Sequence, residues 1–359
     1  MVMQRIDAAA RTLVRHIPFP PIHALFEPTT VCNLGCSRCR RSQSSSVAQI
    51  PGKDKHLTPG RFKEVLDKLR HITVAEFIGD GEPLMNPDWN KLIEIASGKG
   101  IKTQFNTNGM LVTKEDVNFW KKHKVIEVGI SLDTANPETF ERLRPGAKFD
   151  RVIKTCKMIS EAGLKLQLSN ILFAESVPNL PDYIDLCKEV GAKVIAIPRP
   201  HLYGTLKKYL SAYPDPEVAN PILKIALDKA RAAGIRWFEP WYVTTYFKRC
   251  MWPFLAPYIQ IGGTIQPCCF IVGKDRTEYY DGVAYEVPAT SYEMGNIYDD
   301  DFNKIWRGDA FKELRQLLIK TEKPIGTTIE AKDLHALKSD TSSRFSHCVG
   351  CAWRWSVEC

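Results

Sequence analysis

The sequence predicts an α/β fold in which parallel strands form a closed or partial barrel, followed by a smaller cysteine-rich region. Apolar, strand-like runs alternate with amphipathic helical segments between residues 23 and 238, at a repeat of about 25–30 residues, which is the pattern of parallel βαβ units. Such a repeat would also suit a doubly wound sheet. The barrel is favoured because polar and glycine-containing motifs directly follow several predicted strands, and the strand ends of a barrel surround one mouth.

The elements of this barrel have clear start and stop signals. An apolar run at 23–26 is the first strand, and a polar surface loop is expected at 40–56. Thr58 and Pro59 suit the N-cap and first turn of a helix that runs to about residue 70. Glycines end several later helices. The later predicted strands are 74–78, 102–106, 125–132, 165–173, 194–198 and 235–238, and the later predicted helices are 88–97, 113–123, 137–142, 151–162, 180–190 and 217–233.

The two ends of the chain follow different patterns. Residues 7–16 read as a short amphipathic helix. Beyond residue 241, short strands at 258–261 and 264–266 flank Gly262-Gly263, which is close to a two-residue hairpin signal. Residues 302–319 are predicted as one helix. Residues 320–346 are polar with weak periodicity, so a long loop or insertion is expected there.

The composition is that of a water-soluble globular protein, with 44% hydrophobic and 25% charged residues. No run approaches the ~20 apolar residues of a membrane span. Charged residues interrupt the N-terminal apolar stretches, unlike a secretory signal. Eleven cysteines without such a signal argue for a reducing compartment and metal chemistry. The net charge of +8 is spread over helices that also carry acidic residues, so we expect no nucleic-acid partner. The cysteines and the missing signal predict a cytoplasmic protein, and the missing apolar run predicts no membrane partner.

Three cysteines, Cys32, Cys36 and Cys39, follow the first strand in a C-x3-C-x2-C arrangement. Thiolates at such spacings hold iron–sulfur clusters, and three of them leave one iron of a four-iron cluster open to another ligand. A structural zinc site and a reactive thiol cluster are the rival interpretations. Zinc in a structural site takes four protein ligands. Neither His23, inside the apolar run, nor His56, beyond a long polar loop, completes such a set cleanly.

Together with motifs after later strands, this triplet resembles the radical SAM enzyme family. In that family the three cysteines hold a [4Fe–4S] cluster whose open iron is chelated by S-adenosylmethionine (SAM). Residues 79–83, Gly-Asp-Gly-Glu-Pro, resemble the family's Gly-Gly-Glu-Pro element, which receives the methionine amino group. Each motif alone is ordinary turn or cap material, and their order after the cysteines carries the resemblance over residues 22–240. The implied SAM contacts are Gly79, Gly81, Glu82, Asn108, Ser131, Asp133, Arg144 and Asn170.

One residue departs from the family's pattern. Family members usually have an aromatic residue before the third cysteine, packing near the adenine, and here Arg38 stands in that position. The cluster is not in doubt on that account. Arg38 is expected either to face solvent or to touch substrate.

The C-terminal cysteines resemble the SPASM and Twitch modules that some radical SAM enzymes carry. A full SPASM module has seven cysteines and two auxiliary clusters, and this chain has only Cys359 after Cys351. The resemblance therefore implies a Twitch-like module with one auxiliary [4Fe–4S] cluster, or two if the set is fuller. A zinc ribbon on the same thiols is the alternative. Cys269 and Cys359 have no assigned role. Cys156 and Cys187 lie on predicted amphipathic helices and are interpreted as buried core thiols. The implied ligands are Cys250, Cys268, Cys348 and Cys351.

The resemblance implies reductive cleavage of SAM to a 5′-deoxyadenosyl radical that abstracts a hydrogen atom from substrate. An electron donor such as flavodoxin or ferredoxin would supply the electron. Because Cys32 comes too early for a fused peptide-binding domain, a small polar metabolite (a sugar, cyclitol or amino acid derivative) is the expected substrate, with net oxidation or rearrangement. Peptide maturation, as a RiPP or protein-modifying enzyme, is the alternative. A non-catalytic iron–sulfur or zinc protein is the alternative of another class.

Two further residues at strand ends are expected to act on substrate. Arg199 lies between Pro198 and Pro200, which stiffen the strand end, and Glu239 follows the last predicted strand. A guanidinium at this position would bind a carboxylate or phosphate through two hydrogen bonds. Pairing of Arg199 with an acidic side chain on the surface is an equally simple interpretation.

The sequence thus divides into an N-terminal helical extension (1–21), a radical SAM barrel (22–240) and an auxiliary-cluster domain (241–359). The complete expectation for the fold is a partial (β/α)6 TIM-like barrel with a C-terminal Twitch/SPASM-like α+β iron–sulfur module.

Overall fold

The computed structural model describes residues 19–39, 41, 55–198, 202–203, 212, 214–238, 245–246, 250–269, 276–280, 283–287, 292–322, 328–329, 345 and 348. The helix predicted at 7–16, nearly all of the loop at 40–56 and most of the segment 320–346 lie outside these residues. No helix in the described part of the chain has the length and apolar character needed to cross a membrane.

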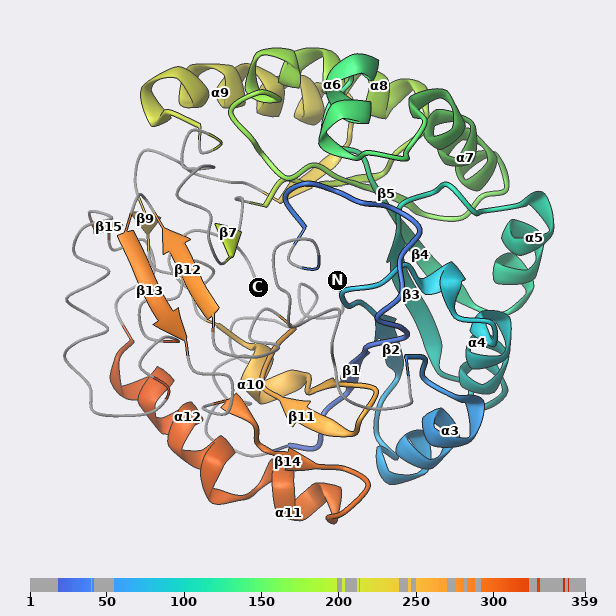
Figure 1. The fold of residues 1–359 in the computed structure, drawn as a ribbon, viewed down its shortest axis with the longest axis vertical. Helices are drawn as coiled ribbons and strands as arrows, with labels where there is room; N and C mark the ends of the chain where they lie inside the picture. Colours follow the sequence, from blue (N-terminus) through green and yellow to red (C-terminus); the bar gives the residue numbers. More distant parts are fainter. Residues whose placement is uncertain are drawn as a thin grey trace.

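A curved sheet of ten strands forms the centre of the molecule, with most of the helices on its outer, convex side (Figure 1). Its strand order is β14-β11-β10-β1-β2-β3-β4-β5-β6-β8, and all neighbours from β10 to β8 run parallel. The parallel α/β barrel predicted from the sequence is therefore present as an open, partial barrel. The strands of this sheet are β1 (His23–Phe26), β2 (Val74–Phe77), β3 (Lys102–Thr107), β4 (Val125–Ser131), β5 (Leu166–Ser169), β6 (Val194–Ala196), β8 (Arg236–Phe238), β10 (Tyr258–Ile259), β11 (Thr264–Gln266) and β14 (Gly295–Asn296).

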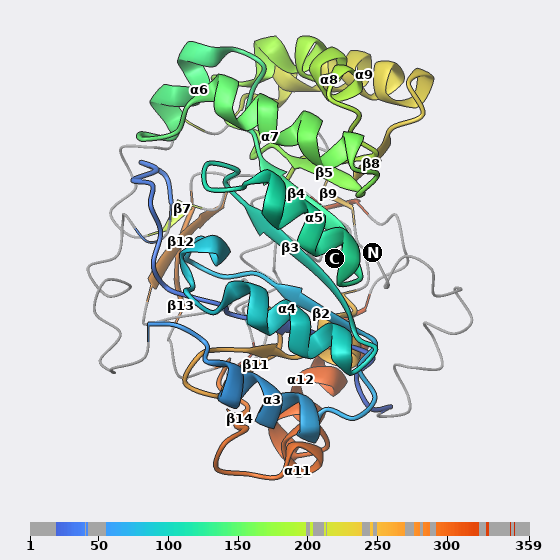
Figure 2. The same cartoon turned by 90° about the vertical axis from the view of Figure 1, so that its right-hand side faces the viewer.

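Helices cover the convex side in chain order, as the side view shows (Figure 2). Single-turn 3-10 helices, η2 (Pro83–Met85) and η3 (Val177–Asn179), follow β2 and β5. The helices around the barrel strands are α3 (Pro59–Lys68), α4 (Trp89–Gly98), α5 (Lys114–Lys122), α6 (Pro137–Leu143), α7 (Phe149–Glu161), α8 (Leu180–Glu189) and α9 (Pro216–Ala232).

The capping signals in the sequence form real caps. Thr58 accepts a hydrogen bond from the backbone N–H of Arg61 and starts α3. Thr113 and Asp116 form a reciprocal capping box at the start of α5, so two otherwise unpaired backbone donors are satisfied. The strand predicted at 165–173 is shorter than expected, because β5 ends at Ser169 and the chain then enters a buried loop.

The core lies between the sheet and the helices. Aromatic rings from alternate strands and helices touch in an edge-to-face or tilted series, with centroid separations of 4.8–5.4 Å, a geometry that favours aromatic pairs beyond their buried area. Because strand side chains alternate between faces, the residues between these rings point to the concave side. The series runs Phe26, Phe62, Phe77, Trp89, Phe105 and Trp120.

The concave face is polar deep inside the barrel. Glu76, Gln104 and Glu127 are direct neighbours on β2, β3 and β4. Gln104 Nε2 donates to Glu76 Oε2 at 2.7 Å, and the same oxygen lies 3.1 Å from Nε2 of buried His23. Lys165 Nζ lies 2.9 Å from Glu127 Oε2. These buried charges are therefore paired, as burial demands.

The C-terminal region completes the sheet. β10 and β11 form the predicted antiparallel hairpin, and Gly263 turns with φ +87°, where a Cβ would lie 2.3 Å from the Tyr298 ring. β10 also pairs with β1 in parallel, so the main sheet continues across the expected boundary at residue 240. The division into three domains remains a prediction. Outside the main sheet, β7 (Leu202–Tyr203), β12 (Arg276–Tyr280) and β13 (Val283–Val287) form one small sheet, and β9 (Thr245–Tyr246) pairs with β15 (Thr328–Ile329).

The prediction of one helix over 302–319 is wrong. The structure has α11 (Phe302–Trp306) and α12 (Asp309–Lys320), separated at Arg307-Gly308. Gly308 is in an extended conformation at the N-cap of α12. A Cβ there would lie 2.6 Å from the backbone oxygen of Lys304, so the tight turn between the helices requires glycine. Buried Arg315 fastens α12 to α10 (Trp252–Leu255) by donating to the backbone oxygen of Pro253 at 2.8 Å.

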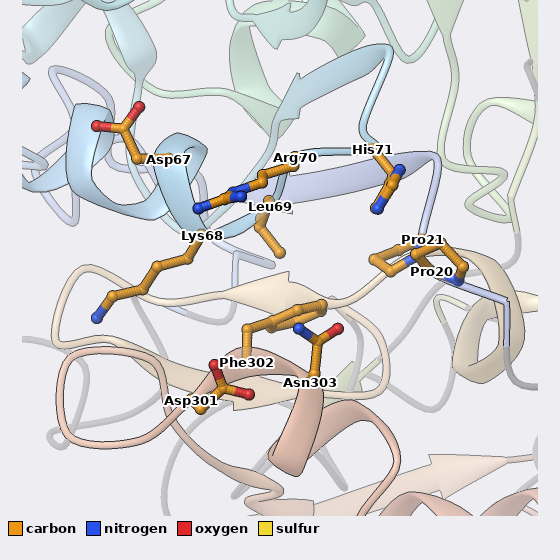
Figure 3. Close-up of a pocket in the computed structure, with 10 residues that line it drawn as sticks. All are labelled: Pro20, Pro21, Asp67, Lys68, Leu69, Arg70, His71, Asp301, Phe302 and Asn303. Carbon is orange, nitrogen blue, oxygen red and sulfur yellow. The ribbon is translucent and has the colours of Figure 1, made fainter.

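A surface pocket of about 450 Å³ lies between the C-terminal end of α3 and the start of α11 (Figure 3). Its lining mixes charges of both signs, including Asp67, Arg70 and Asp301. Since α3 ends just before β2 begins, the pocket lies at the N-terminal ends of the strands. None of the predicted site residues lines it.

Candidate active site

The loop that carries Cys32, Cys36 and Cys39 begins at the C-terminal end of β1. The backbone N–H of Cys39 donates to the oxygen of Cys36 at 3.1 Å, which folds this end of the loop into a turn. The backbone N–H of Gly35 donates to the oxygen of Pro145 at 3.2 Å, which joins the loop to the segment after α6. The three thiols thus lie on a partly buried loop at the barrel mouth.

The pKa of the Cys36 thiol is raised to about 11, chiefly by burial. The Arg144 guanidinium opposes this shift, and Cys39, Asp133 and Cys32 add to it. The three thiols are therefore near enough to interact electrostatically. Within the described residues, no three His, Cys, Asp or Glu side chains converge closely enough to hold a metal ion. Of the two histidines weighed as zinc ligands, His23 lies against Glu76 and Nδ1 of His56 lies 2.9 Å from the Thr29 hydroxyl.

The loop after β2 places Glu82 at the same mouth. Its carboxylate is 3% exposed and accepts hydrogen bonds from the Thr107 hydroxyl at 2.5 Å and the Asn108 backbone N–H at 2.7 Å. The Asn108 side chain donates in turn to Asn33 Oδ1, beside Cys32, at 2.8 Å. Glu82 is therefore fixed between the end of β3 and the cysteine loop.

Gly81 allows the β2 loop to pass directly over the start of the cysteine loop. A Cβ at this position would lie 2.4 Å from the backbone oxygen of Thr29 and 2.6 Å from that of Val31, so no other residue fits without moving the backbone. The next backbone N–H, of Glu82, donates to the Val31 oxygen at 2.8 Å. Gly79 is less crowded, since its added Cβ would meet the Glu27 side chain at 3.0 Å.

Burial raises the pKa of Glu82, against the opposing effect of Arg144 and of the hydrogen bonds from Asn108, Thr107 and the Leu84 backbone N–H. In the folded chain Glu82 therefore holds its proton to higher pH than in the unfolded chain, and stability falls as pH rises through the folded pKa. We expect Glu82→Gln to remove this fall. The difference in free energy of unfolding, variant minus wild type, should increase with pH above the ordinary glutamate range in urea titrations of the metal-free chains. A difference that stays constant or decreases with pH would contradict this account of Glu82.

Asp133 and Arg144 form a buried ion pair beside the thiols. Arg144 Nε donates to Asp133 Oδ2 at 2.6 Å and its Nη2 to Oδ1 at 3.1 Å, a bidentate geometry. Asp133 also accepts from the backbone N–H of Ile171 at 3.1 Å. Desolvation lowers the pKa of Arg144, but the Asp133 carboxylate and the thiols of Cys36 and Cys39 outweigh it and raise the pKa. The guanidinium therefore stays charged next to the cysteine loop.

Asn170 is completely buried after β5, and neither its Oδ1 nor its Nδ2 has a hydrogen-bond partner among the described residues. A buried, unpaired carboxamide costs about 1–3 kcal/mol, so it marks a place where a ligand would supply the missing partners. Ser131 and Ser169, in register at the ends of β4 and β5, lie on the same edge. These free donors and acceptors, with three thiols on one loop, fit a site for SAM and an iron–sulfur cluster.

Arg38 does not face solvent, so that expectation for it is wrong, and contact with substrate stays a prediction. Its side chain is 13% exposed, stacks on the Phe173 ring with its Cζ 4.4 Å from the ring centroid, and donates to Glu175 Oε1 at 2.8 Å. Glu175 also accepts from Arg142 on α6 at 3.2 Å. Arg38 thus ties the cysteine loop to the loop after β5. No local sequence signal indicates this, because its partner lies 137 residues away.

The remaining predicted site residues are only partly described. Cys250 and Cys268 are partly buried and Cys348 is buried. Cys268 packs against the main core, whereas neighbouring Cys269 packs against the concave-face cluster of Leu25, Ala256 and Tyr258. Cys156 and Cys187 are buried core thiols as predicted. Arg199, Glu239 and Cys351 lie outside the described residues.

Sequence reasoning missed two supports of the site, Thr107 and Asn33. Neither residue belongs to a recognised motif, and each positions another site residue through a hydrogen bond. The Thr107 hydroxyl donates to Glu82, and Asn33 accepts from the Asn108 side chain. The turn signal Asn106-Thr107-Asn108-Gly109 after a predicted strand was the available clue for Thr107. Gly109 there has φ +77°, as such a turn requires.

The sequence of the chain matches two known protein families. The profile of the radical SAM superfamily matches residues 26–187, and that of an iron–sulfur cluster-binding domain, SPASM, matches residues 250–351. The mycofactocin maturase MftC of Mycobacterium tuberculosis is 30% identical over 188 residues, which are 52% of this chain and 46% of MftC. The AdoMet-dependent heme synthase of Nitratidesulfovibrio vulgaris is 26% identical over 319 residues, 81% of this chain and 80% of that protein.

A solved structure shares the fold. SuiB of Streptococcus suis, crystallised with its precursor peptide SuiA, superposes with a TM-score of 0.62 at 18% identity, covering 86% of this chain and 69% of SuiB. The chain spans about half the length of most of the curated relatives that it matches, 46% in the case of MftC. The radical SAM domain implies a [4Fe–4S] cluster and SAM, and the SPASM domain implies auxiliary iron–sulfur clusters. The chain therefore contains a radical SAM domain over residues 26–187 and, after it, an iron–sulfur cluster-binding domain of the SPASM type over residues 250–351.

Proposed function

We propose that the substrate of this radical SAM enzyme is a peptide. The observation that carries the proposal is the fold shared with SuiB over 86% of this chain, because SuiB was crystallised with a precursor peptide. The maturase MftC, at 30% identity, points in the same direction. Peptide maturation thus replaces the small polar metabolite that the sequence favoured. That expectation rested on the early position of Cys32, which says nothing about a substrate that another protein presents.

In this proposal Cys32, Cys36 and Cys39 hold the cluster as thiolates. Burial raises the pKa of Cys36 in the metal-free chain, so cluster binding releases a proton from it, and the charge on nearby Arg144 favours that release. Bound together, a [4Fe–4S] cluster and SAM supply a carbon-centred radical that takes a hydrogen atom from substrate. Cys250, Cys268, Cys348 and Cys351 would hold one auxiliary cluster.

The chain's own polar groups at the mouth bind and orient SAM in this proposal. The Glu82 carboxylate and the backbone at Gly79 and Gly81 receive its amino group, and the free Asn170 carboxamide gains partners on binding. Asp133 and Arg144 act together, since the ion pair joins the end of β4 to the segment after α6. Ser131 and Asn108 complete the set. An electron donor such as flavodoxin or ferredoxin would reduce the cluster.

Co-expression tests the substrate class. We expect the chain, produced with each short peptide encoded beside its gene, to change the mass of one of them by loss of hydrogen, as a net two-electron oxidation requires. The Cys36→Ala chain is the control and should leave that peptide unchanged. If every peptide keeps its mass while a small metabolite drives SAM cleavage by the purified enzyme, the peptide proposal is wrong.

The second candidate function is a step of heme formation. It is favoured by one observation, the match to the heme synthase that covers 81% of this chain and 80% of that protein. The same purified enzyme, given a tetrapyrrole carrying carboxylate side chains, separates the two candidates by substrate-dependent formation of 5′-deoxyadenosine.

A further inference from the structure

The concave face of the barrel carries two carboxamide side chains that the proposed SAM contacts leave unused. Asn106 on β3, Gly129 on β4 and Gln167 on β5 are direct neighbours across the parallel strands. They alternate with residues such as Phe105 and Val128, which pack in the core under the helices. Because strand side chains alternate between the two faces, Asn106 and Gln167 point into the barrel.

Gly129 allows the two amides to approach each other. A Cβ added there would lie 1.8 Å from Asn106 Oδ1 and 3.5 Å from Gln167 Nε2. The Asn106 carboxamide therefore lies across the glycine, on the side towards Gln167. Glycine weakens a strand interior and marks positions where another group approaches the backbone closely. Its presence at mid-strand here serves to keep this space open.

Both amides lack a partner in the part of the chain that the structure describes. Asn106 and Gln167 are partly exposed, and within the described residues neither side chain has a hydrogen-bond partner. The row beneath them differs, because Gln104 is bonded to Glu76 at 2.7 Å and Lys165 is paired with Glu127 at 2.9 Å. The side chains of the deeper row are therefore engaged with one another, although Gln104 Oε1 has no hydrogen-bond partner among the described residues.

The row above them contains the strand-end residues at the mouth. Ser131 and Ser169 lie two residues beyond Gly129 and Gln167 on the same strands and are paired in register. The amide pair therefore lies directly beneath the edge that we assign to SAM. A substrate group bound by the pair would lie inside the barrel, next to that edge.

The chemistry of the pair selects one class of group. A carboxamide offers both N–H donors and a C=O acceptor and carries no charge. A peptide main-chain unit offers one N–H and one C=O and matches it. A carboxylate or ammonium group would lose its hydration here, and the charges in the row beneath, such as Glu127 and Lys165, are already paired, so its burial is unfavourable. Resting on the proposed function, we infer that Asn106 and Gln167 bind a main-chain amide of the peptide substrate and reject charged groups at this position.

Ligand-observed NMR on the reconstituted, SAM-bound enzyme tests this pair. The probes are N-acetyl-alanyl-alanine amide, which is uncharged, and the zwitterion alanyl-alanine. We expect saturation transfer to the capped peptide and several-fold less to the zwitterion. Because each lost hydrogen bond weakens binding by about fivefold, Asn106→Leu and Gln167→Met should each reduce the signal, and the double variant should abolish it. Asn303→Leu, on the exposed side of α11, is the matched control and should bind as the wild type does.

Two isosteric or minimal changes keep the test decisive if Asn106→Leu fails to fold. Asn106→Asp retains the shape but replaces the N–H donors with a charge, and Gly129→Ala retains both amides but displaces Asn106. Both should reduce the signal from the capped peptide. Equal binding of the two probes, or full binding by the double variant, would overturn the inference.

The failure of this inference and the failure of the proposed function have different signatures. If the capped peptide binds through this pair but co-expression modifies no peptide, the proposed function fails and the amide site stands. If the double variant modifies a peptide with unchanged KM, the amide site fails and the proposed function stands.

Discussion

Cys36→Ala is expected to eliminate formation of 5′-deoxyadenosine from SAM, because the remaining two thiols, Cys32 and Cys39, would not retain a four-iron cluster that needs three protein ligands to leave one iron open. The effect should appear as loss of the product below detection in the anaerobically reconstituted, dithionite-reduced enzyme, measured by liquid chromatography and mass spectrometry. The barrel should stay folded, since Cys36 lies on a partly buried loop outside every strand and helix.

Cys187→Ala provides the matched control. This thiol is fully buried on α8 with no part in the mouth, so the variant should lose some stability but cleave SAM at the wild-type rate. Iron content gives the second check. One cluster at each site requires about eight irons, and the Cys32, Cys36 and Cys39 triple variant should keep about half of them. Full SAM cleavage by Cys36→Ala would contradict the assignment of the site.

Arg144→Met is expected to cause the largest loss of stability among changes at the mouth. It would leave the Asp133 carboxylate, 2% exposed, without the two charge-assisted hydrogen bonds that hold it. Removing one partner of a buried ion pair lowers the free energy of unfolding by about 3–5 kcal/mol, because the other charge stays buried and uncompensated. Urea unfolding of the metal-free chain, followed by circular dichroism, measures this loss.

A double variant separates the ion pair from the packing of the long arginine side chain. Asp133→Asn in the Arg144→Met background removes the stranded charge, so it should restore a large part of the lost stability. An exposed pair with a single contact, Lys157 Nζ to Glu189 Oε1 at 2.6 Å, serves as the reference, and its Lys157→Met variant should cost less than about 1 kcal/mol. If Arg144→Met loses as little stability as Lys157→Met, the Arg144–Asp133 ion pair does not stabilise the barrel mouth.

The fold was predictable where signals are local. The cap at Thr58 and the alternation of apolar runs identified most barrel elements to within a few residues, because each depends on neighbours in sequence. The break at Gly308 was missed, since a single glycine in an amphipathic pattern does not distinguish a tolerated residue from a turn. The pairing of β10 with β1 was missed because contacts between strands so distant along the chain leave no local trace.

The site was predictable as a set of residues but not as a network. The order of Cys32, Glu82, Asp133 and Asn170 along the chain, each after a strand, indicated a common mouth. The hydrogen bonds that hold them were not predictable. Arg38 is an example, because it contacts Phe173 and Glu175, which are far from it in sequence and lie beside it only in the folded chain. The free amides of Asn106 and Gln167 are likewise visible only once the register of three strands is known.

The central claim is that this chain is an enzyme that cleaves SAM reductively at the mouth of its barrel. Its most direct test is 5′-deoxyadenosine formation by the anaerobically reconstituted wild-type enzyme, reduced with dithionite and given SAM. We predict 5′-deoxyadenosine and methionine in equal amounts, with a cluster signal in electron paramagnetic resonance that shifts when SAM is added. A protein that carries iron yet yields no 5′-deoxyadenosine and no SAM-dependent shift, or one that takes up zinc instead of iron, would contradict the claim.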